Sequence, residues 1–154
     1  MASVAGLAAA GTVSGNVNVS ATLNSACEVS ASGGAISFGG ITNLLSAGDK
    51  TANSGSTFQV ACSSDMSPTI YSTTARVMDD GATGVLPFNL SLTSGAASND
   101  LPTAQVDGVA LSITKDGTLK TVTLYAKVLA SNFTGANAQP GGAYSKVVTV
   151  SVDY

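Results

Sequence analysis

The sequence predicts an all-β protein built as an antiparallel sandwich. Its 154 residues fall into short stretches in which apolar and polar residues alternate, which is typical of strands with one buried face. Clusters of Gly, Ser, Asn and Asp separate these stretches, as turns separate antiparallel strands. No long stretch carries the period of an amphipathic helix. About seven or eight short strands with regular turns favour an immunoglobulin-like sandwich, and a jelly roll or barrel is the alternative.

The composition argues against several classes of function. Hydrophobic residues make up 44% of the chain, charged residues only 10%, and the net charge is −3. The polar surface must therefore come mostly from Ser, Thr, Asn and Gly, as in a surface-exposed β protein rather than a cytosolic enzyme. The six basic residues are scattered along the chain. Because they form no basic stripe, we expect no nucleic-acid partner.

The first predicted strand, residues 12–23, alternates strictly between apolar and small polar residues. Its apolar members are Val13, Gly15, Val17, Val19, Ala21 and Leu23. At ~3.3 Å per residue this strand would span roughly 40 Å, enough to cross a small sandwich. No turn ties it to a following partner strand. It is therefore either an ordinary first strand or a strand offered to another molecule.

Residues 1–11 are similar to the end of a secretory signal, with a short apolar stretch and small residues at 8–10. No positively charged region precedes that stretch. We therefore expect either a truncated signal or a weakly ordered N-terminal lead. Nothing else approaches the ~18 apolar residues of a transmembrane helix, so the exported body is expected to be soluble. This divides the chain into the lead, residues 12–24 as a strand, and 25–154 as one domain.

Cys27 and Cys62 are the only cysteines. An even count in a charge-poor β protein indicates one disulfide and an oxidising compartment, and two separate buried thiols are the alternative. The strand 57–62 alternates so that Phe58, Val60 and Cys62 share one face, where Cys27 could reach from an adjacent strand. A disulfide here would close a loop of ~35 residues, which the chain-entropy model values at ~3–4 kcal/mol.

Further strands are predicted along the rest of the chain. They are 35–38, 69–78, 85–92, 106–113 and 122–128, with turns at 79–81 and 116–117 and loops at 41–56, 63–68 and 132–142. Pro87 removes one ladder donor, so the strand 85–92 is expected at an edge or starting late. The chain finishes with an alternating strand over residues 144–154. Its core face is predicted to comprise Val148, Val150, Val152 and Tyr154.

Few residues in the chain suit catalysis or metal binding. It has no histidine, which removes the usual general base and the commonest metal ligand. Asp79 and Asp80 could be paired carboxylates or part of a calcium site, but the following glycine favours a turn. Arg76, the only arginine, could bind an anion or pair with a nearby aspartate. We therefore expect no enzyme, no metal and no cofactor.

Several motifs resemble, in order and spacing, the spore coat protein U domain, a family that includes the major pilins of archaic, Csu-type chaperone–usher pili. The resemblance extends from Thr12 to Tyr154. The motifs are Cys27 after the alternating strand, Ile36-Ser37-Phe38-Gly39, Val60-Ala61-Cys62, Arg76-Val77-Met78, residues 86–92, Leu124-Tyr125-Ala126-Lys127-Val128 and the ending 142–154.

The resemblance implies a sandwich that lacks one strand and is completed by the N-terminal donor strand of a neighbouring subunit. Residues 12–24 would be that donor strand, with Gly15 where the groove has no room for a side chain. Identical subunits would then polymerise head to tail, helped by a periplasmic chaperone and an outer-membrane usher, into an extracellular fimbrium that serves adhesion and biofilm formation. The alternative is a secreted, self-complete sandwich that acts as a monomeric coat or carbohydrate-binding module.

Overall fold

The computed structural model describes residues 20–22, 24–30, 34–41, 48–53, 55–95, 101–133 and 142–154. Its strands are β1 (Cys27–Ser30), β2 (Lys50–Thr51), β3 (Ser56–Cys62), β4 (Thr69–Tyr71), β5 (Val77–Asp79), β6 (Val85–Pro87), β7 (Asn89–Ser91), β8 (Val109–Ala110), β9 (Lys120–Val128) and β10 (Ser151–Asp153). Two short 3₁₀ turns, η2 (Gln105–Asp107) and η3 (Ala130–Phe133), accompany them. Among the described residues, no helix has the length and apolar character needed to cross a membrane.

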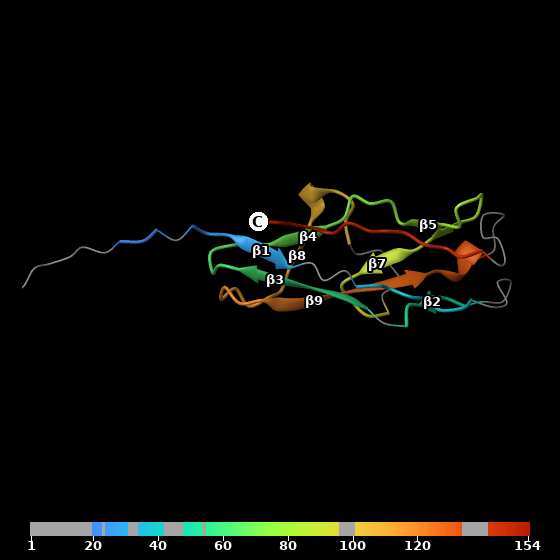
Figure 1. The fold of residues 1–154 in the computed structure, drawn as a ribbon, viewed down its shortest axis with the longest axis horizontal. Coiled ribbons are helices and arrows are strands. Elements are labelled where there is room, and N and C mark those ends of the chain that lie inside the picture. Colours follow the sequence, from blue (N-terminus) through green and yellow to red (C-terminus); the bar gives the residue numbers. More distant parts are fainter. Residues whose placement is uncertain are drawn as a thin grey trace, which may run out of the picture.

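The described strands form an elongated body, with β3 and β9 along one side and β4 and β5 along the other (Figure 1). β1, β3, β9 and β2 pair in that order, and β7 also pairs with β9. A second sheet has the order β10-β4-β8, and β5 pairs with β6. All of these pairings are antiparallel. The predicted all-β, antiparallel fold class is confirmed.

β9 is the central strand of the first sheet, because it pairs with β3, β2 and β7. Its residues alternate between buried and partly exposed from Val122 to Val128, as predicted for 122–128. The register places Phe58 opposite Val122 and Leu90 opposite Ala126. Apolar side chains of three strands thus reach the same face of this sheet.

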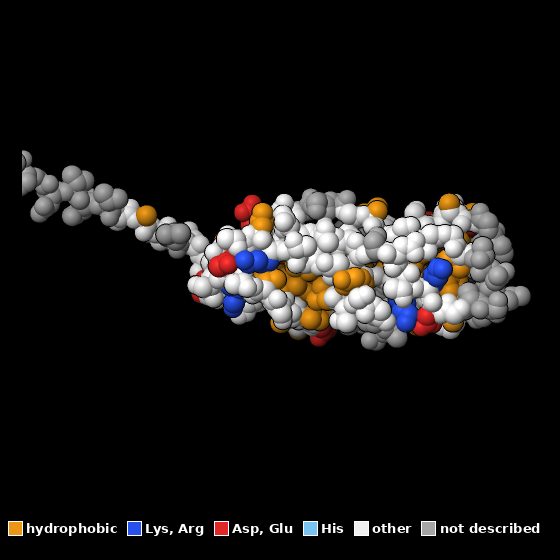
Figure 2. Space-filling view, turned by 90° about the horizontal axis from the view of Figure 1, so that it is seen from below, with side chains coloured by type: hydrophobic (Ala, Val, Ile, Leu, Met, Phe, Trp, Pro, Cys, Tyr) orange, Lys and Arg blue, Asp and Glu red, His pale blue; other side chains and the backbone are white. Residues whose placement is uncertain are grey.

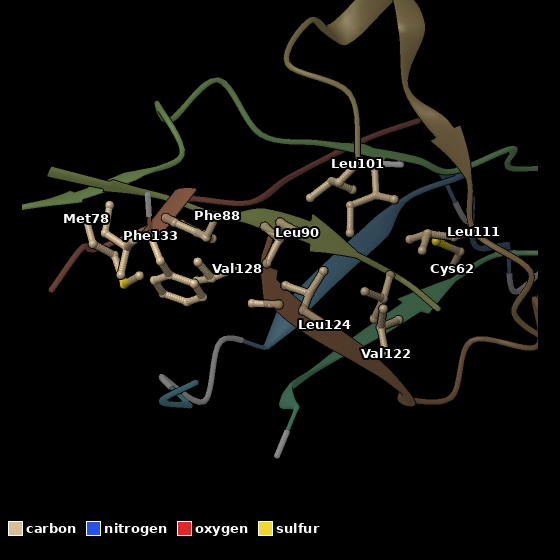
Figure 3. Close-up of a cluster of buried hydrophobic side chains, with 14 residues drawn as sticks. Cys62, Met78, Phe88, Leu90, Leu101, Leu111, Val122, Leu124, Val128 and Phe133 are labelled. Atoms are coloured by element: carbon tan, nitrogen blue, oxygen red, sulfur yellow. The ribbon is translucent and has the colours of Figure 1, made fainter. Parts of the chain in front are cut away.

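The hydrophobic core lies on that face. Figure 3 shows Leu90 and Leu124 pointing into the interior that Leu101 and Leu111 enter from the opposite side. Its most deeply buried apolar residues are Val60, Ile70, Leu90, Leu101, Val128 and Cys62. The predicted inward face of strand 57–62 is thereby confirmed for Val60 and Cys62, while Phe58 packs partly buried against the core.

Cys27 and Cys62 form the predicted disulfide. They are direct partners in the register of β1 and β3, and their sulfur atoms are 2.08 Å apart. The bond therefore ties the edge strand β1 to the sheet at the point where the chain enters the domain.

Two long predicted strands are interrupted. Residues 69–78 divide into β4 and β5, because the N–H of Ser72 leaves the sheet and donates to the carbonyl of Pro102 (2.9 Å). Residues 85–92 divide into β6 and β7 at Phe88. There the chain changes partners from β5 to β9. Pro87 lies in the two-stranded β5–β6 ribbon, in keeping with its predicted edge position.

The strand predicted over 106–113 is mostly wrong. Residues 105–107 form η2, and only Val109 and Ala110 pair with β4. The N–H of Gly108 donates to the carbonyl of Gln105 (3.0 Å) and closes the turn. A Cβ at Gly108 would lie 2.8 Å from the Thr69 hydroxyl oxygen, so only glycine fits this approach. The turn leaves Val106 fully on the surface.

The C-terminal strand is also shorter than predicted. Val148, Val150 and Val152 pack partly buried against the core, but only Ser151–Asp153 pair with β4. Tyr154 is 61% exposed, so its predicted place in the core is wrong. The register explains this, because Asp153 pairs with Thr69 and the next position on β4's side is Pro68, which has no N–H to donate.

Candidate functional site

An apolar groove of about 850 Å³ lies in the described part of the molecule. Segments 34–41 and 142–150 supply its two walls. Its floor consists of Met78, Leu86, Phe88, Leu90, Leu124, Ala126 and Phe133. These floor residues also belong to the core cluster. Figure 2 shows a face on which hydrophobic side chains form a band along a hollow in the body.

The first wall, segment 34–41, belongs to no strand of the described structure. One backbone hydrogen bond joins it to the rest of the described chain, from the N–H of Asn53 to the carbonyl of Ser37 (2.8 Å). Ile36, Phe38 and Ile41 nevertheless pack partly buried against the core. The predicted strand 35–38 is therefore irregular chain with apolar anchors, and it pairs with no strand among the described residues.

The second wall, residues 142–150, is attached at two places. Asp79 and Ser145 exchange backbone hydrogen bonds of 3.2 and 3.0 Å. Further along, the Ser72 hydroxyl donates to the carbonyl of Thr149 (2.6 Å), and the N–H of Thr149 donates to the Thr74 hydroxyl (3.0 Å). Val148 lines the groove between these attachments and Val150 lines it beyond them. Val147 also lies along the groove, with its side chain 87% exposed.

The groove is almost free of charge. Lys146 is the only charged residue among its described lining residues. Its ammonium lies 3.9 Å from the Asp79 carboxylate at the rim. No group of three or more potential metal ligands occurs among the residues that the structure describes. An extended chain with apolar side chains on one face matches this chemistry better than a charged or metal-dependent ligand does.

The predicted donor-strand residues are only partly within the described chain. Val13, Gly15, Val17, Val19 and Leu23 lie outside it. Ala21 is exposed and lies in irregular chain. Figure 1 shows the described N-terminal residues leading away from the body.

The base of this N-terminal segment is tied to the body by a cluster that sequence reasoning missed, which we call the Asp65 clamp. It consists of Ser25, Ala26, Ser63 and Asp65. The hydroxyls of Ser25 and Ser63 both donate to the Asp65 carboxylate, the latter at 2.9 Å. Three further hydrogen bonds join Ala26 and Ser63. The Ala26 N–H donates to the Ser63 hydroxyl (3.1 Å), and the Ala26 carbonyl accepts from the Ser63 N–H (3.0 Å) and from the Ser63 hydroxyl (3.4 Å). The Ser25 hydrogen bond, followed by that of Ser63, holds the pKa of Asp65 below its ordinary value.

The turn predicted at 79–81 begins at Asp80, because Asp79 is the last residue of β5 and pairs with Val85. Gly81 has a φ of +77°, and one Asp80 carboxylate oxygen accepts hydrogen bonds from the N–H groups of Ala82 and Gly84, both 2.9 Å. Asp79 instead faces Lys146 at the groove rim. The two carboxylates therefore have separate structural tasks.

Arg76 is buried, and its guanidinium donates to the carbonyls of Leu101 (2.5 Å) and Pro102 (3.4 Å). These contacts hold the end of a long loop against the core. The sequence pattern offered no signal for this role, because the carbonyl partners lie 25 and 26 residues away.

Together the fold and the groove define an all-β protein in which described core residues line an apolar groove. The chain belongs to the Spore Coat Protein U domain family, whose model matches residues 13–151. This is a family of structural coat and pilus subunits rather than of enzymes. No curated protein matches the chain.

Proposed function

We propose that this chain is the structural subunit of an extracellular filament, in which residues 12–24 of one subunit fill the groove of the next. The groove carries the proposal. Core residues line it between two walls, and segment 34–41 pairs with no strand in the part of the chain that the structure describes. An added strand would supply both the missing side chains and the missing backbone partners.

The sequence of residues 12–24 suits this groove. Every second residue is apolar or glycine, so one face of an extended strand could enter the groove while the other, made of small polar residues, stays in water. Burying the four large aliphatic side chains (Val13, Val17, Val19 and Leu23) at ~1.5–3 kcal/mol each would contribute roughly 6–12 kcal/mol before entropy costs. This is enough for a long-lived joint between subunits.

The proposed contact joins unlike surfaces, since a strand of one copy enters a groove of another. Such a head-to-tail contact does not close on itself and generates an open filament. Before assembly, the same groove would expose core and an open backbone edge, which is an aggregation hazard. A periplasmic chaperone that covers the groove would meet this need. An outer-membrane usher would then replace the chaperone with the donor strand of the next subunit, and the filament would form at the cell surface.

The main alternative is a secreted sandwich that keeps its own first strand and works as a monomeric coat or carbohydrate-binding module. The direction of residues 20–22 and 24–26 favours the filament, because they lead away from the body (Figure 1). In a self-complete domain, this segment would have to turn back at once toward the groove.

A truncation with peptide rescue tests the proposal. A subunit that lacks residues 1–24 should aggregate or stay monomeric with an open groove, and a synthetic peptide of residues 12–24 should bind it one to one and raise its melting temperature. The same peptide with Val17→Asp should not bind, because a charge would enter an apolar groove. The matched Asn18→Asp peptide, with the charge on the polar face, should still bind. A truncated chain that is soluble, stable and indifferent to all three peptides would contradict the proposal.

A further inference from the structure

The Asp65 clamp has a consequence for the joint between subunits. It fixes Ser25 and Ala26 to the turn at Ser63–Asp65 through four side-chain and backbone hydrogen bonds. The disulfide at Cys27 holds the next residue to β3. The N-terminal segment is therefore anchored to its own domain from residue 25 onward.

The length of free chain follows from this anchor. The last predicted groove-filling residue is Leu23, two positions before Ser25. Two residues of extended chain reach at most about 7 Å. Hence a strand that fills a neighbour's groove as far as Leu23 leaves almost no linker between the two domains.

We propose that Asp65 is the positioning residue of the filament joint, fixing the direction in which residues 12–24 leave their domain so that successive domains meet in direct contact. This deepens the proposed function and rests on it. The partner is a second copy of this chain, at the mouth of its groove. The contacting face is the one that carries the clamp, where the Lys115 ammonium also donates to the carbonyl of Met66 (2.5 Å) and holds the same turn.

The clamp can be tested on the monomer. A nitroxide spin label at Ala21→Cys, attached after the native disulfide has formed, reports how freely the segment moves relative to the domain. Asp65→Ala should shorten the label's rotational correlation time at least twofold, and Ser25→Ala should have a smaller effect in the same direction. Asp107→Ala, at an exposed acid in η2, is the matched control and should leave the label unchanged. If Asp65→Ala leaves the mobility as it is in the wild type, the clamp is not the anchor and the inference is overturned.

The joint can be tested on filaments of the full chain by electron microscopy. Asp65→Ala filaments should form, because the groove and the donor residues are intact, but their persistence length should fall at least twofold relative to the wild type and Asp107→Ala. Unchanged stiffness together with a mobile label would overturn the inference about the joint. If the wild type forms no filaments, the proposed function and the joint both fail, while the label measurement still decides the role of the clamp. The melting temperature of the Asp65→Ala monomer should stay close to that of the wild type. If the variant instead unfolds at a clearly lower temperature, general destabilisation explains the flexible filaments and the positioning role is overturned. Ser25→Ala, which removes only one hydrogen bond of the clamp, repeats the stiffness measurement with a milder change.

Discussion

Asp79 and Ser145 exchange two backbone hydrogen bonds, of 3.2 and 3.0 Å, and thereby attach the second groove wall to β5. The attachment is local, because Ser145 belongs to no longer ladder among the described residues. This backbone pair holds the wall at Ser145, and the contacts of Thr149 with Ser72 and Thr74 hold it again between Val148 and Val150.

Ser145→Pro should loosen this wall. Proline removes the N–H that donates to the Asp79 carbonyl, at a cost of about 0.5–1.5 kcal/mol for the hydrogen bond alone. The affinity for a peptide of residues 12–24 should fall by a larger factor than the global stability does. Calorimetric titration and chemical denaturation measure the two effects. Val106→Ser, at an 89% exposed side chain that does not line the groove, is the control and should change neither. An unaltered affinity in Ser145→Pro would contradict the role assigned to this pair.

Leu90→Ala should destabilise the domain by about 2–5 kcal/mol, because it opens a cavity in the core beneath the groove. Leu90 is 1% exposed and lies on β7, where it pairs with Ala126 of β9. Urea denaturation monitored by circular dichroism gives the difference. Leu119→Ala, at a half-exposed leucine, should cost less than about 0.5 kcal/mol. Equal effects at the two positions would contradict the description of the core.

Replacing both Cys27 and Cys62 by alanine should cost about 3–4 kcal/mol, the value that chain entropy gives for the loop they close. The loss should appear as a lower denaturation midpoint that reducing agent does not lower further. The wild type in reducing agent should approach the same midpoint. A midpoint equal to that of the oxidised wild type would show that the bond contributes nothing to the folded state.

The clamp should respond to acid rather than to base. Its hydrogen bonds lower the pKa of Asp65 in the folded protein, so the stabilisation is present above the unfolded pKa of about 3.8 and is lost as the pH falls through the lower folded value. Ser25→Ala should raise the pKa of Asp65, since the Ser25 hydrogen bond is the largest cause of the shift. An NMR titration of the Asp65 carboxyl carbon measures both values. The charge of Lys115 also lowers the pKa of Asp65, by a smaller amount. If the pKa of Asp65 is the same in Ser25→Ala as in the wild type, Ser25 does not belong to the clamp.

The sequence predicted those features that depend on local pattern. Alternation identified β3 and β9, and the turn residues at 79–81 and 116–117 coincide with Gly81 and Gly117 at positive φ. The pairing of Cys27 with Cys62 followed from their number and from the face that Cys62 shares with Val60. These features could be predicted because strands and turns are encoded within a few neighbouring residues.

Other features could not be predicted, because distant contacts decide them. Alternation over 85–92 is continuous, yet the chain changes sheets at Phe88, whose N–H donates to the Arg76 carbonyl (3.0 Å). The alternation predicted that Val106 lies in a strand, but the close approach of Gly108 to Thr69 goes with a turn at this place. Serines at 25 and 63 and an aspartate at 65 carry no recognisable motif, and only the pairing of β1 with β3 brings them together. The groove was predicted from the family resemblance and not from the alternation of residues.

A cross-linking scan between two populations of the chain tests the central claim most directly. One population carries Val148→Cys in the groove wall, and the other carries a single cysteine at 13, 16, 17, 18 or 19. If the N-terminal strand of one copy fills the groove of another, oxidation should give mixed dimers that depend on the position with a period of two, strong at one or more of 13, 17 and 19 and weak at 16 and 18. A scan with no mixed dimers, or with no difference between the two faces of the strand, would contradict the account.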